Sequence, residues 1–376
     1  MSIKIVHSAD HHIGMKFNSY PEIVRKKLME ERFLALKRIV DYGNDHKAHL
    51  LILTGDLFDS TTIKAADIKT TVSILNAFSG DAVWIIPGNH DFYQPGEDAI
   101  WEKLKKAKNE KIHVFDAYQS YGFEVNGIEL VVYPCACRSK HSTDSVVGWV
   151  GREEKEKNKL HLGLAHGNVE GLGLDKEGKY FNMTREELAS LGVDLWLLGH
   201  IHVPYPSHES VTTNPGLFMA ATPTPDGWDR KHPGYCWYIE INDKKDIKAN
   251  RVRIGGLQFY NKSFEINAQT DIDKLKAEIN SMDKENSLVR IELKGRLGEA
   301  EIIEVEQLLQ TWKNDFLHLE LNNQLKHLIN QAYINTHYID DSLPHKLLTS
   351  LLEEDSGGIS VQLANQLIER LQKTSK

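Results

Sequence analysis

Five short apolar runs in this chain each end in residues whose side chains commonly bind metal ions. The runs cover residues 3–6, 50–53, 83–86, 160–165 and 195–198. The polar residues that follow them are Asp10-x-His12, Gly55-Asp56, Gly88-Asn89-His90-Asp91, His166 and Gly199-His200-x-His202. Each run is rich in leucine or β-branched residues, which is typical of a buried strand. The chain is therefore expected to fold around buried strands that present polar side chains at their ends.

The segment between the first two runs has the apolar spacing of a helix, predicted over residues 21–45. Its apolar residues are Ile23, Leu28, Phe33, Leu36, Ile39 and Val40. A strand, helix, strand order favours parallel pairing of the two strands. In open α/β sheets, ligands bind outside the carboxyl ends of the strands. All five polar clusters are expected at that edge.

The types of these residues suit a hydrolytic site with two metal ions. Such ions lie roughly 3.5–4 Å apart and need a shared anionic ligand, for which Asp56 is the natural candidate. Imidazole, carboxylate and amide oxygen suit manganese, iron, zinc or magnesium. Paired ions polarise phosphoryl oxygens and generate hydroxide near neutral pH. His90 is then free to act as a proton donor.

With Asp59 added, these motifs resemble the calcineurin-like metallophosphoesterase superfamily. The resemblance is to the SbcD-type DNA repair nuclease branch in the identity and order of the residues in three places: residues 10–14, residues 55–60 and a further carboxy-terminal segment. Protein phosphatases of the superfamily usually carry arginine and glutamate where this chain has Ser60 and Asp91. One stretch, residues 218–225, departs from the nuclease pattern, a difference that bears on substrate preference and not on the metal ligands.

The resemblance implies an α/β fold, a two-sheet sandwich flanked by helices, with a smaller α/β cap and C-terminal helices. It also implies two divalent ions, Mn²⁺ first and Mg²⁺, Fe or Zn²⁺ as alternatives. One ion would be held by Asp10, His12, Asp56 and His202, and the other by Asp56, Asn89, His166 and His200. His90 would be catalytic. The side chain of Asp59 would orient His90, as outer partners of a metal site commonly do.

Length, net charge and cysteine content are compatible with this interpretation but do not select one function. The 376 residues predict two or more domains. The net charge of -8 is not that of a DNA-coating protein, so any DNA contact needs local basic surface. Candidates are Arg25-Lys26-Lys27, the lysines of residues 103–111, Lys244-Lys245, Arg251 and Arg253. Three cysteines, no cleavable leader and no membrane-spanning run predict a soluble, cytoplasmic protein with structural cysteines.

Near Gly255-Gly256 the composition changes from rich in glycine and histidine to rich in lysine, glutamate and leucine. This change predicts a nuclease domain over 1–256 and a capping domain over 257–325. The cap is expected to have strands at 263–267, 288–293 and 316–321, and helices at 271–282 and 299–312. The last part, 326–376, has amphipathic helices at 343–352 and 361–371. They either complete the core of the cap or dock onto a partner. The resemblance favours docking, because SbcD-type subunits work with an SbcC-type coiled-coil ATPase.

A helix is also predicted over residues 63–78, packed on the core or, as the resemblance implies, at the interface of a homodimer. Together with this resemblance, the ligand set predicts a manganese-dependent nuclease that hydrolyses DNA phosphodiesters, with His90 protonating the departing oxygen. Two alternatives stay open. One is a phosphatase or phosphodiesterase of small nucleotides or phosphoproteins, and the other is a scaffold subunit with little intrinsic activity.

Overall fold

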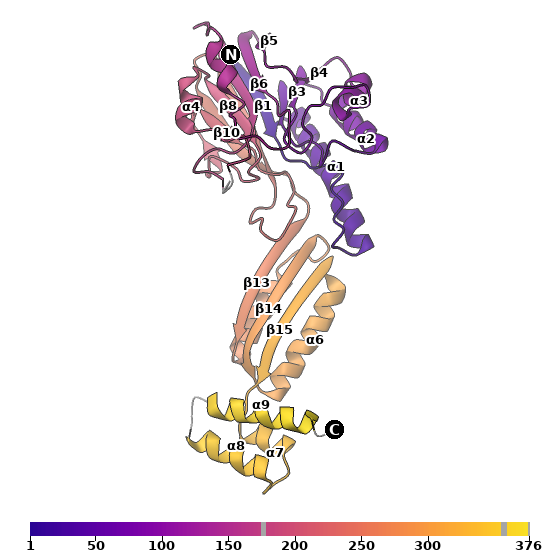
Figure 1. The fold of residues 1–376 in the computed structure, drawn as a ribbon, viewed down its shortest axis with the longest axis vertical. Helices are drawn as coiled ribbons and strands as arrows, with labels where there is room; N and C mark the ends of the chain where they lie inside the picture. The colour runs from indigo at the N-terminus through magenta and orange to yellow at the C-terminus, as the bar shows by residue number, and fades with distance from the viewer. Residues whose placement is uncertain (174–177, 355–358, 375–376) are drawn as a thin grey trace. The chain divides into compact units, whose positions relative to one another are not determined.

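The computed structural model describes residues 1–173, 178–354 and 359–374. The chain divides into two compact units, Met1–Gln258 and Phe259–Lys376, which are described separately (Figure 1). Among the described residues, the helices are all too short or too polar to span a membrane.

The first unit contains a seven-stranded and a five-stranded sheet. In spatial order, the strands of the larger sheet are β4 (Ile112–Val114), β3 (Ala82–Ile86), β2 (Leu50–Thr54), β1 (Ser2–Ser8), β11 (Tyr235–Asn242), β12 (Ile247–Arg253) and β9 (Ser210–Val211). Those of the smaller sheet are β10 (Leu217–Met219), β8 (Leu195–Gly199), β7 (Leu160–His166), β6 (Ile128–Cys135) and β5 (Tyr121–Val125). The five predicted strands are confirmed as β1, β2, β3, β7 and β8. They are parallel to their neighbours among themselves, three in one sheet and two in the other.

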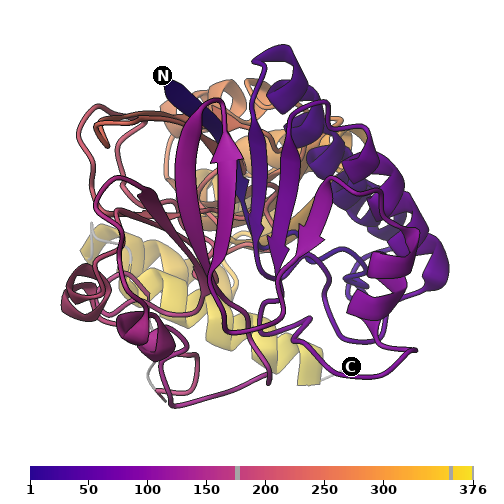
Figure 2. The ribbon, with the colours of Figure 1, turned by 90° about the horizontal axis from the view of Figure 1, so that it is seen from above.

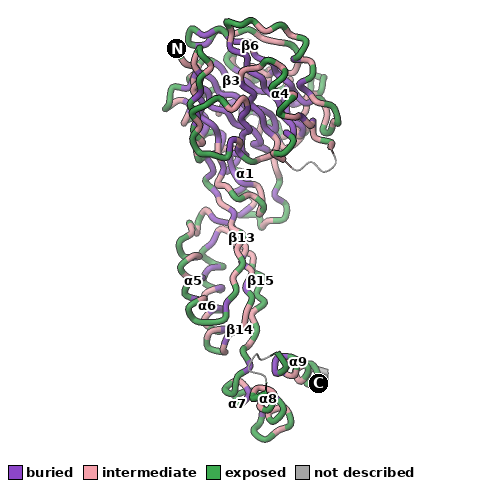
Figure 3. Tube along the Cα trace, turned by 90° about the vertical axis from the view of Figure 1, so that its left-hand side faces the viewer, coloured by how far each residue is buried: buried purple, intermediate pink, exposed green. Residues whose placement is uncertain are grey.

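The two sheets pack face to face, which confirms the predicted sandwich. Strand β2 shows why its sequence is continuously apolar. Leu50 and Ile52 belong to the core between the sheets, whereas Leu51 and Leu53 belong to the core beneath the helices. A strand covered on both faces needs apolar residues at every position. The tube in Figure 3 shows this buried interior.

Helices cover the outer faces of the sandwich. Those on the larger sheet are α1 (Glu22–Asp45), α2 (Ala65–Asn76) and α3 (Ile100–Ala107), and Figure 2 shows them on one side of the strands. The smaller sheet is covered by α4 (Arg185–Ser190) and the short 3₁₀ helix Gly148–Arg152. Ile68, Val72 and Leu75 of α2 are buried, so this face of the helix packs on its own core.

The second unit begins with a small α/β layer pair, as predicted for the cap. Its sheet has the order β13 (Gln258–Ile266), β14 (Ser287–Leu297) and β15 (His318–His327). Helices α5 (Gln269–Asn280) and α6 (Glu299–Asp315) share a core with this sheet, which includes Leu275, Ile291 and Trp312. The connections are long enough for β14 and β15 to pair in parallel.

Three helices end the chain: α7 (Gln331–His337), α8 (Leu343–Glu354) and α9 (Ile359–Thr374). Helix α7 was not predicted from the sequence. The three helices share a small core of their own, in which Ile334, Leu348 and Val361 are fully buried. These helices therefore do not complete the core under α5 and α6. Figure 3 shows that much of α8 and α9 is exposed.

Candidate metal centre

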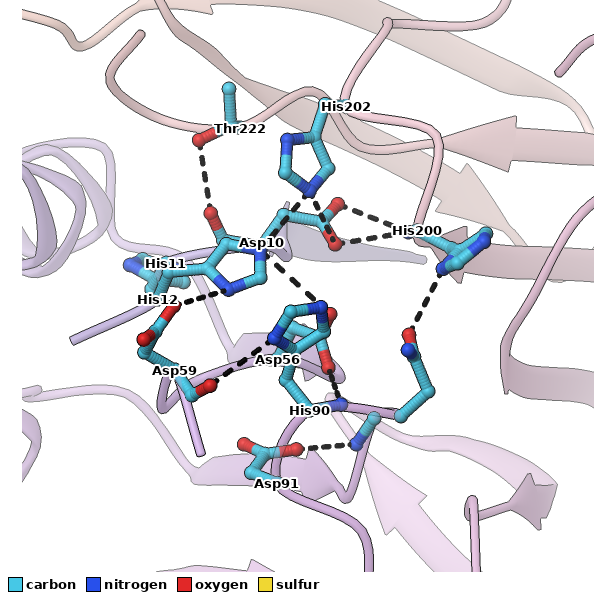
Figure 4. Close-up of polar contacts among 12 residues, drawn as sticks. Asp10, His11, His12, Asp56, Asp59, His90, Asp91, His200, His202 and Thr222 are labelled. Atoms are coloured by element: carbon cyan, nitrogen blue, oxygen red, sulfur yellow. Dashed lines mark hydrogen bonds and ion pairs between the residues drawn. The ribbon is translucent and has the colours of Figure 1, made fainter. Parts of the chain in front are cut away.

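The carboxyl ends of five strands converge at one site in the first unit. Strands β1, β2, β3, β7 and β8 lead into Asp10, Asp56, Asn89, His166 and His200 respectively. His12 and His202 lie two residues further along two of the same loops. Figure 4 shows the side chains of Asp10, His12, Asp56 and His202 pointing toward one another from separate loops. The predicted site residues, far apart in sequence, are brought together.

Strained backbone turns the site residues inward. Five of them have a positive φ: Asp10 at 57°, His12 at 46°, Asp56 at 51°, His200 at 109° and His202 at 57°. Non-glycine residues adopt this left-handed region rarely, and such strain clusters at functional sites. Backbone hydrogen bonds between the loops after β1 and β2 stabilise this left-handed conformation. The Asp10 amide donates to the Gly55 carbonyl at 3.1 Å and the His12 amide to the Asp56 carbonyl at 2.9 Å.

Two glycines permit the close approach of these loops. A Cβ atom at Gly55 would lie 2.2 Å from Nδ1 of His166, and the φ of Gly55 is also positive, at 91°. A Cβ atom at Gly88 would lie 2.3 Å from both the amide nitrogen and Oδ1 of Asp56. Both distances are far below van der Waals contact, so only glycine fits.

One side of the site is formed by two histidines and two aspartates. Nε2 of His12 lies 3.1 Å from Nε2 of His202. Nε2 of His202 is 3.7 Å from Oδ1 of Asp10, and Nε2 of His12 is 3.7 Å from Oδ2 of Asp56. Asp10, His12 and Asp56 are at most 2% exposed. The potential ligand atoms of Asp10, His12 and His202 thus lie within 4.8 Å of one another, and His12 links them to Asp56.

The other side uses the same oxygen of Asp56. Nε2 of His166 lies 3.3 Å from Oδ2 of Asp56 and 3.0 Å from Oδ1 of Asn89. Nδ1 of His200 lies 3.0 Å from that same Asn89 oxygen. Asp56 therefore belongs to two groups in which the potential ligand atoms lie within 4.8 Å of one another, one with His12 and His90 and the other with His166 and His200.

The contacts of His166 show that this side is built for a cation. Its Nδ1 donates to the carbonyl of Thr54 at 2.8 Å, so in the neutral ring Nε2 carries a lone pair. That lone pair faces the oxygens of Asp56 and Asn89, and three acceptors repel one another unless a cation lies among them. A proton on Nε2 meets the same need when no metal ion is bound: burial opposes a charge on His166, but the Asp56 carboxylate outweighs it and raises the pKa of His166 to about 9. The residues therefore fit a bound metal ion.

Asp56 itself stays ionised. Burial disfavours its charged form, but His166 and His12 more than compensate and hold its pKa well below the usual range. A carboxylate that is buried, ionised and shared is what two adjacent cations require.

His90 lies at the edge of this centre. Its amide donates to Oδ1 of Asp56 at 2.8 Å, and its ring Nδ1 lies 3.1 Å from the carbonyl oxygen of Asp59. Burial lowers the pKa of His90, while the Asp56 carboxylate opposes this shift. The Asp59 carboxylate, expected to orient His90, faces His12 instead, with Oδ1 at 3.6 Å from Nδ1. The main chain of Asp59, and not its side chain, thus contacts His90.

Three supporting residues had no role assigned from the sequence. Asp91 accepts from the amides of Gly88 at 2.7 Å and Phe58 at 3.0 Å, which ties the loop after β3 to the loop after β2. Burial and the Asp56 carboxylate raise the pKa of Asp91 to about 7. Thr222, in the stretch that departs from the nuclease pattern, donates to the carbonyl of Asp10 at 2.9 Å. Asp226 lies 3.1 Å from Nδ1 of His202.

The three cysteines are buried and free, in agreement with a structural role. Cys137 donates to the carbonyl of His166 at 3.3 Å, and burial raises the pKa of its thiol well above the usual value. A neutral thiol is a poor metal ligand.

Comparison with known proteins points to one family. The sequence profile of the calcineurin-like phosphoesterases matches residues 3–204. The uncharacterized metallophosphoesterase YhaO of Bacillus subtilis (strain 168) is 25% identical over 223 residues, which are 53% of this chain and 48% of that protein. The chain thus spans about half the length of this curated relative.

Solved structures also match the chain, at low identity. TT1561 of Thermus thermophilus is 14% identical with a TM-score of 0.38, over 67% of this chain and 100% of that one. The purple acid phosphatase PPD1 from yellow lupin (Lupinus luteus) seeds is 12% identical with a TM-score of 0.40, over 67% of this chain and 52% of that one.

Proposed function

Because this chain belongs to the calcineurin-like phosphoesterase family, we propose that it is a two-metal phosphodiesterase that cleaves DNA in DNA repair. The observation that carries the proposal is that Asp56 lies between His12 and His166, each of which belongs to a separate group of predicted ligands. The nuclease assignment is supported by the resemblance of the loops after β1 and β2 to the SbcD-type branch. A scaffold without activity is less well supported, since a degenerate site would have lost at least one of these positions.

We assign the ligands to two ions, for which Mn²⁺ is our first choice. One ion would be held by Asp10, His12, Asp56 and His202, and the other by Asp56, Asn89, His166 and His200. When bound, such a pair polarises the phosphoryl oxygens and lowers the pKa of water. The chain contributes the rigid, largely water-excluded frame of ligands, so little reorganisation is needed during the reaction.

His90 is the residue that we place beside the leaving group. Since its Nδ1 faces the Asp59 carbonyl, Nδ1 is the nitrogen that keeps its proton. Nε2 is then the atom that holds and transfers a proton to the departing oxygen. Burial lowers the pKa of His90, which makes its imidazolium a stronger acid. The contact from its amide to Asp56 keeps the ring close to both clusters.

One observation favours the smaller-substrate alternative. Several of the basic residues considered for DNA binding are paired with carboxylates of this chain. Lys105 lies 2.8 Å from Glu102, and Lys245 lies 2.8 Å from Asp194. Paired lysines attract phosphates weakly. A phosphodiesterase of small nucleotides would use the same metal centre without a basic groove.

The deciding experiment offers both substrates at once. End-labelled linear duplex DNA is incubated with Mn²⁺ and wild-type protein or His90→Ala, with a mononucleotide phosphate ester as competitor. We expect wild-type protein alone to shorten the DNA, with little turnover of the ester. Intact DNA with rapid ester hydrolysis would replace the nuclease by the small-substrate phosphodiesterase.

We also propose that α9 binds an SbcC-type coiled-coil ATPase. Its residues Ile359, Leu363, Leu367 and Leu371 recur every fourth position, which places them on one face. They are 62%, 58%, 60% and 67% exposed. A contiguous apolar stripe of this kind marks a protein interaction site more often than a free surface.

Co-expression tests the interaction. The double variant Leu363→Glu/Leu367→Glu is expected to lose co-purification with the ATPase while keeping the hydrolytic activity of the isolated chain. Ser350→Glu, at another exposed position of the same helical group, is the matched control and should still co-purify. Retention of the complex by the double variant would refute this docking site.

A further inference from the structure

Asp226 contacts the ring of His202 on the side that faces away from the other predicted ligands. Its Oδ2 lies 3.1 Å from Nδ1 of His202, and the two side chains are only 9% and 13% exposed. The opposite ring nitrogen of His202, Nε2, is the atom that faces Asp10 and His12. The carboxylate thus contacts the one ring nitrogen that is not directed into the site.

Two arginines hold this carboxylate and its loop in place. Arg230 donates from Nε to Oδ1 of Asp226 at 3.0 Å. Arg32 is 1% exposed, and its guanidinium donates to the carbonyls of His11 and Thr224, both at 3.3 Å, which ties the backbone just before Asp226 to the loop after β1. Asp226 is therefore held in place between Arg230 and His202.

The main chain of His202 is held by the same loop. Nδ1 of His232 accepts from the Gly234 amide at 3.2 Å, so its Nε2 carries the proton and donates to the His202 carbonyl at 2.7 Å. The segment 226–234 thus contacts His202 at its ring and at its backbone.

The contact fixes the tautomer of His202. With a carboxylate at Nδ1, the proton of the neutral ring stays on Nδ1, and Nε2 keeps its lone pair. The Asp59 carboxylate lies 3.6 Å from Nδ1 of His12, which is too far for a hydrogen bond. Nε2 of His202 lies 3.1 Å from Nε2 of His12. The lone pair of His202 is therefore directed to the place where one ion would be bound by both rings.

We propose that Asp226 is a positioning residue that fixes His202 for binding of the ion shared with Asp10 and His12, and so sets the affinity of that ion selectively. This inference rests on the two-metal function proposed above. The ion on the other side would be bound by His200, which lies in the same loop as His202 but faces Asn89 instead of Asp226. Loss of Asp226 should weaken the binding of one ion and leave the binding of the other unchanged.

The test is stepwise Mn²⁺ binding by calorimetry with Asp226→Asn, which keeps the volume of the side chain and removes its charge. Loss of an outer partner of a metal-binding histidine typically weakens metal binding roughly 10–100-fold. We expect that loss for one of two ions, with the second dissociation constant unchanged. Asp229→Asn is the matched control, because Asp229 lies in the same loop, contacts Arg230 at 3.5 Å and is 72% exposed. It should bind both ions as the wild type does.

The outcomes separate this inference from the function on which it rests. Two ions bound by Asp226→Asn with wild-type affinity would overturn the role of Asp226 and leave the two-metal function intact. Equal weakening of both ions, together with a lower melting temperature in chelator, would show a merely structural role and would also overturn it. Failure of the wild type to bind two ions would instead refute the proposed metal centre itself.

Discussion

Asp56→Ala is expected to lose both metal ions and nearly all hydrolytic activity. Asp56 Oδ2 lies within 3.3–3.7 Å of a histidine nitrogen on each side of the site, so one substitution removes a ligand from both ions. Metal ions supply several kcal/mol of transition-state stabilisation, which corresponds to a loss of roughly 10³-fold or more. Metal content by mass spectrometry and hydrolysis of bis(p-nitrophenyl) phosphate measure both effects.

The control for this variant is Asp98→Ala, which removes a carboxylate from a fully exposed side chain in the same unit. It should keep the metal content and the activity of the wild type. An Asp56→Ala protein that is folded, retains two ions and hydrolyses the diester at the wild-type rate would exclude the shared-ligand arrangement.

His90→Ala is expected to lower turnover by roughly 10²–10⁴-fold while the metal content stays that of the wild type. The contact of His90 with Asp56 is made by its amide, which the substitution leaves in place. The loss should depend on the leaving group. A nitrophenolate departs without help from an acid, whereas the alkoxide of a DNA strand requires a proton, so the loss should be much larger on DNA.

Rates with bis(p-nitrophenyl) phosphate and with a dinucleotide, measured on the same preparation, separate these effects. His90 also lies in a cluster with His12 and Asp56 in which it could ligate an ion. Reduced metal content in His90→Ala, with equal losses on both substrates, would make His90 a ligand and refute its role as an acid.

The fold was largely predictable because its strands are buried on both faces. Such strands read as short, continuous apolar runs, and β1, β2, β3, β7 and β8 were all located in this way. Strand β15 was predicted too short, over 316–321 instead of His318–His327. Its second half contains Asn322, Asn323 and Gln324, which have low strand propensity. Pairing with β14 extends the strand over these residues, and such pairing is not visible in the local sequence.

The site was predictable where the ligands directly follow strands. Supporting residues were harder to predict, because their partners lie far away in the chain. Asp91 belongs to a recognised motif, yet its hydrogen bond to the Phe58 amide requires the packing of two loops. Asp226 follows a stretch without clear family pattern, and its relation to His202 depends on how that loop folds back. Asp59 was identified through the family resemblance, but which of its atoms contacts His90 depends on backbone geometry.

The central claim is that Asp56 joins two metal-binding clusters into one hydrolytic centre. The most direct test is to count Mn²⁺ ions per chain in reconstituted wild-type protein and to follow phosphodiester hydrolysis on the same sample during chelation. The account predicts about two ions per chain and hydrolysis that disappears as they are removed and returns when they are restored. Hydrolysis that continues after both ions have been removed, or saturation at a single ion with full activity, would contradict it.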